Sequence, residues 1–166
     1  MFPTISTVLL AAFIPIAVGF IYYNPKVLGG VWMRASGMTE EKMKGTNMLV
    51  IFGVSLLLSF VLGFIMFSLT VHQTDIYSLH AGDQGFRVEG SATMYQINEL
   101  MNEYRERFRT FGHGALHGAV IGLFVVLPVL GTNALFERKN GTYIFVNVGY
   151  WVICLSLMGG VLCQWG

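Results

Sequence analysis

Charge is scarce in this chain, and four long stretches lack it altogether. No Asp, Glu, Lys or Arg occurs in residues 1–25, 45–74, 110–136 or 140–166. Each stretch is longer than the ~20 residues that an α-helix needs to cross the hydrocarbon core of a bilayer. With 54% hydrophobic and 11% charged residues, the composition excludes an ordinary soluble domain. The sequence therefore predicts an all-α membrane protein with four transmembrane helices.

Features of secreted proteins are also scarce. The first stretch has no basic segment and no small-residue cleavage site, so we expect a retained helix and not a signal peptide. The chain has only two cysteines, Cys154 and Cys163, in the last stretch. Nine positions along one helix separate them by about 13 Å, too far for a disulfide. Both are predicted to be packing residues.

Patterns that carry catalysis are missing as well. No Asp or Glu falls within a predicted span, no His-Glu-x-x-His occurs, and no glycine-rich phosphate loop follows a strand. We therefore expect a protein that is not an enzyme. Its first partner is the lipid bilayer, and no nucleic-acid partner is expected.

The polar residues that remain are confined to three connections. In the first, residues 26–46, Thr39 precedes two glutamates and predicts a helix N-cap at which the second span begins. The third is a short turn at residues 137–141. Residues 1–166 thus form a single four-helix transmembrane domain, and residues 72–111 are inserted in it as a polar loop and an amphipathic helix.

The end of that insertion has an apolar stripe. Its members recur at three- and four-residue spacing, which predicts an amphipathic helix of about five turns. We expect this face to dock on the membrane interface or on a partner surface, because exposed aromatic rings would forgo the free energy of burial. The stripe consists of Ile97, Leu100, Met101, Tyr104, Phe108 and Phe111.

Aromatic and basic residues predict how the spans meet the membrane surface. Tyr22, Tyr23 and Trp32 are suited to anchor the chain at headgroup level. The connections after the first and third spans hold four and two Lys or Arg residues, the longer insertion between the second and third spans holds four, and the termini hold none. Retention of these basic residues in the cytoplasm would put both termini and the long loop outside.

Small residues recur at every fourth position in the spans, a pattern that lets helix backbones approach closely in lipid. Such a face serves packing within the chain, which is the preferred interpretation, or a dimer interface. The residues concerned are Gly114, Gly118 and Gly122 in the third span, and Ser55, Ser59 and Gly63 in the second.

The four histidines fall on one side of the predicted membrane. His113 and His117 are four positions apart, so they project from one helical face at a spacing that can chelate a metal ion. His72, at the end of the second span, is the candidate further ligand, either for a metal ion or for a haem held between two helices. The alternative is that the histidines only hydrogen-bond to carbonyls or water, in which case no cofactor is bound.

Two regions of the sequence contain residues in the same order as members of a known family. Residues 19–29 read Gly-Phe-Ile-Tyr-Tyr-Asn-Pro-Lys-Val-Leu-Gly and precede Trp32, and residues 133–139 read Asn-Ala-Leu-Phe-Glu-Arg-Lys and precede Asn-Val-Gly-Tyr-Trp at 147–151. This order resembles the bacterial membrane family called domain of unknown function 1761, over nearly the whole chain except the long loop. At Tyr22 the family often has Trp. The resemblance implies a small four-helix protein of the bacterial inner membrane, and it transfers no catalytic residue.

Three functions are compatible with these patterns. We favour a non-catalytic integral membrane protein that acts by association, as a homo-oligomer or as an accessory subunit of a larger membrane complex. An oligomeric transporter or channel component is an alternative, because Pro15 before Gly19 and Pro128 before Gly131 hint at two related halves. The other alternative is a membrane protein with a histidine-ligated metal or haem.

Overall fold

The computed structural model describes residues 2–166, and all regular elements in that range are helical; Met1, the first residue of the first uncharged stretch, lies outside it. Four helices are long and apolar enough to cross a membrane. The all-α fold class with four spans is therefore confirmed. The spans are α1 (Ile5–Tyr22), α4 (Met48–Thr70), the continuous helix Phe111–Phe136 and α9 (Gly141–Trp165).

The third span is composite. It consists of α7 (Phe111–Ile121), a π-helical turn (Gly122–Val126) and α8 (Leu127–Phe136). Pro128 lies just after the π-helical turn and has no backbone N–H, so the regular i to i−4 ladder is interrupted there. The wider turn keeps the helix continuous across this interruption.

Polar side chains cap the starts of three spans. The Asn47 side chain accepts hydrogen bonds from the N–H groups of Leu49 and Val50, at 3.1 and 3.3 Å. Asn140 and Thr110 cap α9 and α7 in the same way. Free N–H groups at a helix start near lipid have few other partners, so these caps determine where each span begins.

The second span starts later than the sequence predicts. Thr39 does cap a helix, but this is α3 (Glu40–Met43), which ends after one turn. Gly45 then adopts a positive φ of 86°, and α4 begins at Met48 behind its own Asn47 cap. The prediction of a span beginning at Thr39 was therefore wrong, because a second cap and a left-handed glycine intervene.

The stretch after α1 is a tight turn and not a flexible linker. Pro25–Gly29 forms a π-helical turn, capped by the Asn24 side chain on the Lys26 N–H at 2.9 Å, and α2 (Gly30–Ser36) follows directly. A Cβ on Gly29 would lie 2.2 Å from the Tyr23 carbonyl oxygen, so only glycine fits there.

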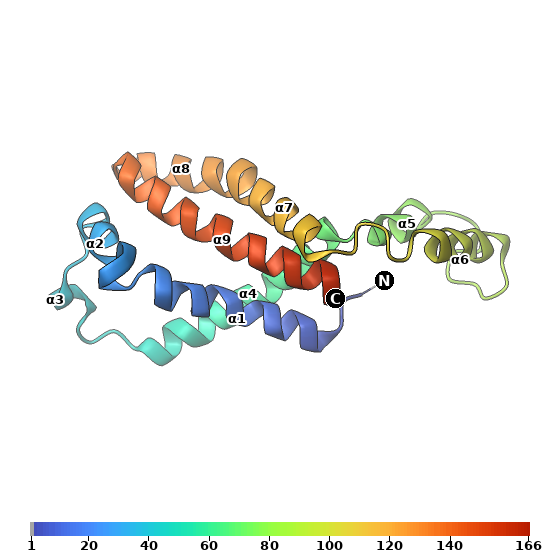
Figure 1. Cartoon of the computed structure of the whole chain (residues 1–166), viewed down its shortest axis with the longest axis horizontal. Coiled ribbons are helices and arrows are strands. Elements are labelled where there is room, and N and C mark those ends of the chain that lie inside the picture. The colour runs from blue at the N-terminus through green and yellow to red at the C-terminus, as the bar shows by residue number, and fades with distance from the viewer. Residues whose placement is uncertain (1) are drawn as a thin grey trace.

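Helix α9 is the centre of the bundle and packs against α1, α4 and α7 (Figure 1). Its contact with α7 is unusually close. A Cβ on Gly118 would lie 2.0 Å from the Leu155 carbonyl oxygen, and one on Gly114 would lie 2.1 Å from that of Gly159. The glycine face of the third span is thus occupied by α9 of the same chain. The buried core around α9 includes Val8, Met66, Phe67, Leu155, Met158 and Leu162.

The inserted segment projects from the end of the bundle at which α1 begins and α9 ends (Figure 1). It contains α5 (Gln73–Leu79) and α6 (Ala92–Tyr104), which pack against each other. Ile97 is fully buried, while Leu100, Met101 and Tyr104 are half-buried. The first part of the apolar stripe therefore serves the α5–α6 contact.

The amphipathic helix is shorter than the stripe predicts. It ends at Tyr104, and Phe108 has a positive φ of 63°, which no α-helical residue adopts. Phe111 is already the first residue of α7. The prediction that Phe108 and Phe111 lie on the same helix as Ile97 was wrong, because the chain reverses between α6 and α7.

We expect Gly118→Ala to destabilise the protein by roughly 1–3 kcal/mol, because the added methyl group collides with the α9 backbone. Thermal unfolding of the purified protein in mild detergent measures this loss. Gly53→Ala in α4 is the matched control, since nothing lies within 4 Å of a Cβ at that position. Equal melting temperatures for the two variants would contradict the close contact.

Candidate metal centre

Three of the four histidines come together where α4, α5 and α7 meet. His72 lies between the end of α4 and the start of α5. His113 and His117 lie one turn apart on α7, which the Thr110 hydroxyl caps by accepting a hydrogen bond from the His113 N–H at 3.3 Å. We call His72, His113 and His117 the histidine triad.

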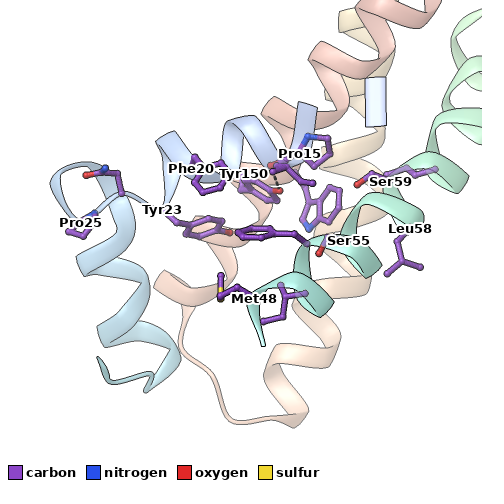
Figure 2. A pocket seen from close by; sticks show the side chains of 16 residues that line it. Pro15, Phe20, Tyr23, Pro25, Met48, Ser55, Leu58, Ser59 and Tyr150 are labelled. Atoms are coloured by element: carbon purple, nitrogen blue, oxygen red, sulfur yellow. Dashed lines mark hydrogen bonds between the residues drawn. The ribbon is translucent and has the colours of Figure 1, made fainter. Parts of the chain in front are cut away.

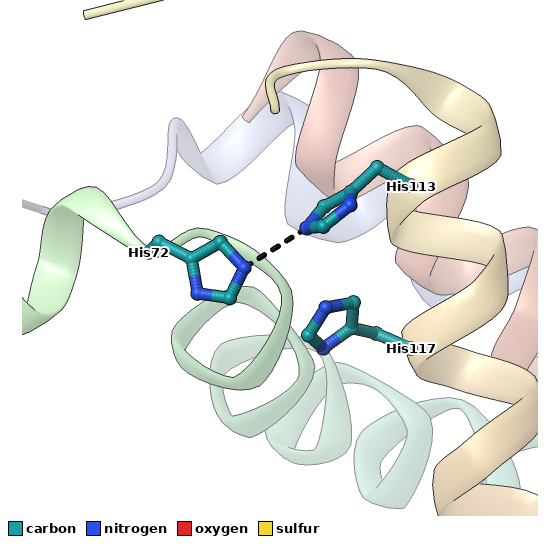
Figure 3. A group of neighbouring side chains, drawn as sticks. All are labelled: His72, His113 and His117. Atoms are coloured by element: carbon teal, nitrogen blue, oxygen red, sulfur yellow. Dashed lines mark hydrogen bonds between the residues drawn. The ribbon is translucent and has the colours of Figure 1, made fainter. Parts of the chain in front are cut away.

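The triad rings face one another (Figure 3). The Nε2 atoms of His72 and His113 are 2.9 Å apart, and one ligand nitrogen from each of the three histidines lies within 4.8 Å of the others. His72 is exposed, and the two α7 histidines are half-buried. The distance between Nε2 atoms requires that one ring donates and the other accepts, so at least one of these imidazoles is neutral.

Three imidazoles in this arrangement are a known type of ligand set. Catalytic zinc sites use three protein ligands and leave a fourth position open, with Zn–N distances near 2.0–2.1 Å. In a tetrahedral site such distances separate the nitrogens by about 3.3 Å. The separations in the triad, from 2.9 Å to at most 4.8 Å, lie on both sides of this value, so the rings would have to shift to coordinate one ion.

One aromatic ring, that of Phe108, covers one side of the triad. The Phe108 ring stacks on that of His113, with centroids 4.9 Å apart and planes at 19°. It also meets His72 edge-on at 5.9 Å. The left-handed backbone at Phe108 turns this ring onto the triad, a position that the helical spacing of the sequence does not predict.

Gln73 anchors the turn that carries Phe108. Its Nε2 donates hydrogen bonds to the carbonyl oxygens of Tyr104, Arg105 and Arg107, at 2.6, 3.4 and 2.9 Å. The side chain is 3% exposed. Sequence reasoning missed this residue, because glutamine is usually exposed and its three acceptors lie more than 30 positions away in the sequence.

A cavity of about 410 Å³ adjoins the triad. The triad shares only His72 with this cavity. It is lined by His72, Gln73, Ile76, Tyr104, Arg107 and Phe108.

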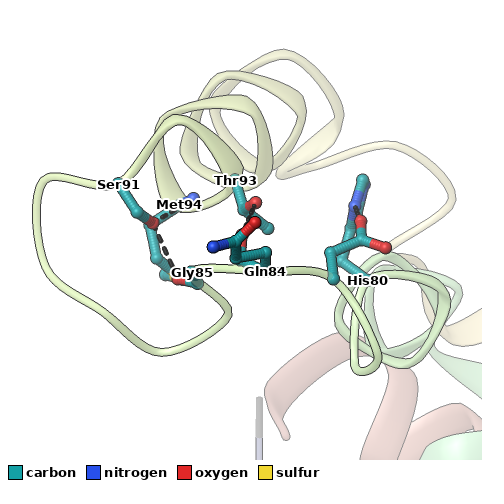
Figure 4. Close-up of polar contacts among 7 residues, drawn as sticks. His80, Gln84, Gly85, Ser91, Thr93 and Met94 are labelled. Carbon is teal, nitrogen blue, oxygen red and sulfur yellow. Dashed lines mark hydrogen bonds and ion pairs between the residues drawn. The ribbon is translucent and has the colours of Figure 1, made fainter.

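His80 and Cys163 do not belong to the triad. The His80 Nδ1 pairs with the Asp83 carboxylate at 2.7 Å within the inserted segment (Figure 4). In the same segment Ser91 caps α6 and donates to the Gly85 carbonyl. The buried Cys163 thiol is within 3.3 Å of the carbonyl oxygens of Thr70 and Phe108.

The predicted membrane anchors lie at the opposite end of the bundle and form contacts within the chain. The Tyr22 hydroxyl donates to the Val146 carbonyl at 3.0 Å, and that of Tyr23 donates to the Asn147 side chain at 3.1 Å. Trp32 packs edge-on against Tyr23, with centroids 5.5 Å apart. These residues therefore tie α1 and α2 to α9.

The tyrosine-rich turn after α1 and its Asn147 partner in α9 correspond to the two regions that resemble a known family. The sequence matches the family profile described as "Protein of unknown function (DUF1761)" over residues 6–163. The chain belongs to the DUF1761 family. Comparisons with curated proteins and with solved structures gave no match.

This DUF1761 protein has a second, larger cavity of about 750 Å³ between α1, α4 and α9 (Figure 2). Ser55 and Ser59 line it, together with Tyr23, Tyr150 and apolar side chains. Gly63 lies beyond it on α4, where an added Cβ would come within 2.9 Å of Val8. The two serines thus face a groove, and the glycine makes the close contact between α4 and α1.

We expect Gln73→Met to loosen the turn between α6 and α7 of this DUF1761 protein, because three carbonyl groups lose their donor. The free energy of unfolding should fall by about 1–3 kcal/mol. Hydrogen exchange should accelerate in residues 105–110. Gln96→Met is the matched control, since Gln96 is exposed on α6. Unchanged exchange in Gln73→Met would contradict the anchoring role of this side chain.

Proposed function

We propose that this DUF1761 protein binds one transition-metal ion of the zinc type through His72, His113 and His117. One observation carries the proposal. Two segments whose histidines are 41 positions apart in the sequence bring one ligand nitrogen from each of three imidazoles within 4.8 Å of the others. Imidazole nitrogen is a preferred ligand of zinc, copper, nickel and iron ions.

The hydrogen bonding of the triad supports an ion over a purely structural cluster. The bond between His72 and His113 occupies one nitrogen of each ring. The His117 ring makes no hydrogen bond to any of residues 2–166, although it is half-buried next to the other two rings. A bound cation would use all three nitrogens, and protonation of all three rings would bring like charges together.

The spacing also favours an ion over haem. A haem iron with two axial histidines needs a gap between the rings that is wide enough for the macrocycle. His72 and His113 are in direct contact, and Phe108 already stacks on His113. A single ion requires no such opening.

We further propose that the protein lies in the bacterial inner membrane, with the metal site, both termini and the inserted segment outside the cytoplasm. The six basic residues of the two short connections lie at the opposite end of the bundle, which supports this orientation. Binding, and not catalysis, is the proposed activity, because no carboxylate lines the cavity beside the triad.

Two other functions stay predictions. One is association with a second copy or with a larger complex, and the other is the role of a transporter component. The glycine face of α7 packs on α9 and so does not support a dimer interface.

We expect the purified wild-type protein to carry about one metal ion per chain, as purified or after incubation with Zn²⁺ and removal of excess metal. The double variant His113→Ala/His117→Ala should carry none, while His80→Ala should match the wild type because His80 pairs with Asp83. Metal analysis of all three proteins makes the comparison.

Visible absorption of the same samples distinguishes an ion from haem. A haem band that is present in the wild type and absent from the double variant would show that the histidines bind haem and not a single metal ion. Wild-type protein with neither metal nor haem would overturn the proposal.

Metal affinity should fall as the pH is lowered from about 7.5 to about 5.5. Each coordinating imidazole must be neutral, and the ordinary pKa of histidine is about 6.5, so protons compete with the ion below that pH. Competition with a chromophoric chelator measures the affinity at each pH. The single variant His72→Ala should show a shallower dependence, because one fewer proton is displaced. An affinity that does not change over this range would contradict histidine ligation.

A further inference from the structure

We infer that the 410 Å³ cavity beside the histidine triad binds an oxyanion of the phosphate type, held by Arg107 and able to reach the coordination position that three histidines leave open. The inference rests on the proposed metal site. Four features of the cavity carry it: a cation without a carboxylate partner, the proximity of the triad, a lining without carboxylates and a position at the end of the bundle.

Arg107 supplies the first feature. It lines the cavity, and its guanidinium lies 5.2 Å from the Tyr104 ring centroid and 5.6 Å from that of Phe108. These aromatic faces orient the side chain through cation–π attraction. In residues 2–166 the ion pairs are His80 with Asp83 and Arg105 with Glu106, so Arg107 has no carboxylate partner. Its planar fork of donors matches the oxygens of phosphate or carboxylate.

The triad supplies the second positive charge when an ion is bound. His72 lines the cavity, and Phe108 lines it while stacking on His113. A three-histidine site leaves an open position that takes water or an exogenous ligand. A metal ion and a guanidinium on the same cavity favour an anion between them, because no carboxylate among the lining residues opposes them.

The residues that line the cavity lie in the inserted segment, which ends where the third span begins. This segment projects from one end of the bundle (Figure 1). A phosphate group can reach such a position in two ways. It can arrive as a free phosphate ion from the aqueous side, or as the headgroup of an anionic phospholipid in the adjacent leaflet.

Protein loaded with Co²⁺ in nanodiscs of phosphatidylcholine tests the inference, because the visible absorption of Co²⁺ reports its ligands. Titration with orthophosphate should shift the Co²⁺ bands of the wild type and reach saturation. Arg107→Gln should retain the starting Co²⁺ spectrum, and its apparent Kd for phosphate should be at least about tenfold higher than that of the wild type. Arg105→Gln is the matched control, since Arg105 does not line the cavity and its side chain is 78% exposed, and it should behave as the wild type.

The second arm uses nanodiscs that contain phosphatidylglycerol and no added phosphate. A shifted spectrum in this arm alone supports the inference with a lipid headgroup as the source, and a shift with orthophosphate supports a free anion. A normal Co²⁺ spectrum that neither source changes overturns the inference and leaves the metal site standing. Equal responses of Arg107→Gln and the wild type also overturn it. Failure of the wild type to bind Co²⁺ overturns the proposed function itself, and the anion site with it.

Discussion

The close approach of α7 to α9 is the contact on which the rest of this molecule depends. Lipid tails are as apolar as the side chains of the spans, so burial of apolar surface gives little drive for helices to associate within a bilayer. Gly114 and Gly118 of α7 instead let its backbone approach the Gly159 and Leu155 carbonyl groups of α9 directly. With α7 held on α9, the face that carries His113 and His117 is directed toward the end of α4, where His72 lies.

The connection between α6 and α7 supplies further residues to the candidate site. It is held from two sides: the Gln73 amide binds three of its carbonyl groups, and the Cys163 thiol of α9 contacts a fourth, that of Phe108. The same turn presents Phe108 to the triad and Arg107 to the adjoining cavity. The inserted segment therefore contributes both to the proposed ligand site and to its supporting contacts.

The two ends of the bundle have different chemistry. At the end formed by α2 and the turn after α8, tyrosine hydroxyls bind acceptors on α9, and the Lys139 ammonium donates to the Ser36 carbonyl at 2.7 Å. These contacts join α1 and α2 to α9 and the turn before it, largely through residues of the two regions, 19–29 and 133–151, that resemble the DUF1761 family. At the other end the imidazoles are available and Arg107 has no carboxylate partner among residues 2–166. The residues of these two regions thus stabilise the fold, while the proposed metal site is formed by residues near the inserted segment.

The sequence by itself determined the number of spans, their approximate limits and the family, because a bilayer demands about 20 apolar residues per crossing and charge interrupts such a run unmistakably. It also indicated which histidines could act together, since a four-residue spacing puts two on one helical face. Only the tertiary structure decided where α6 ends and what surrounds the triad. Helical spacing continues from Tyr104 to Phe108 and Phe111, but the chain turns there because Gln73, far away in the sequence, binds the carbonyl groups of that segment. Contacts of this kind join distant residues, so no local pattern records them.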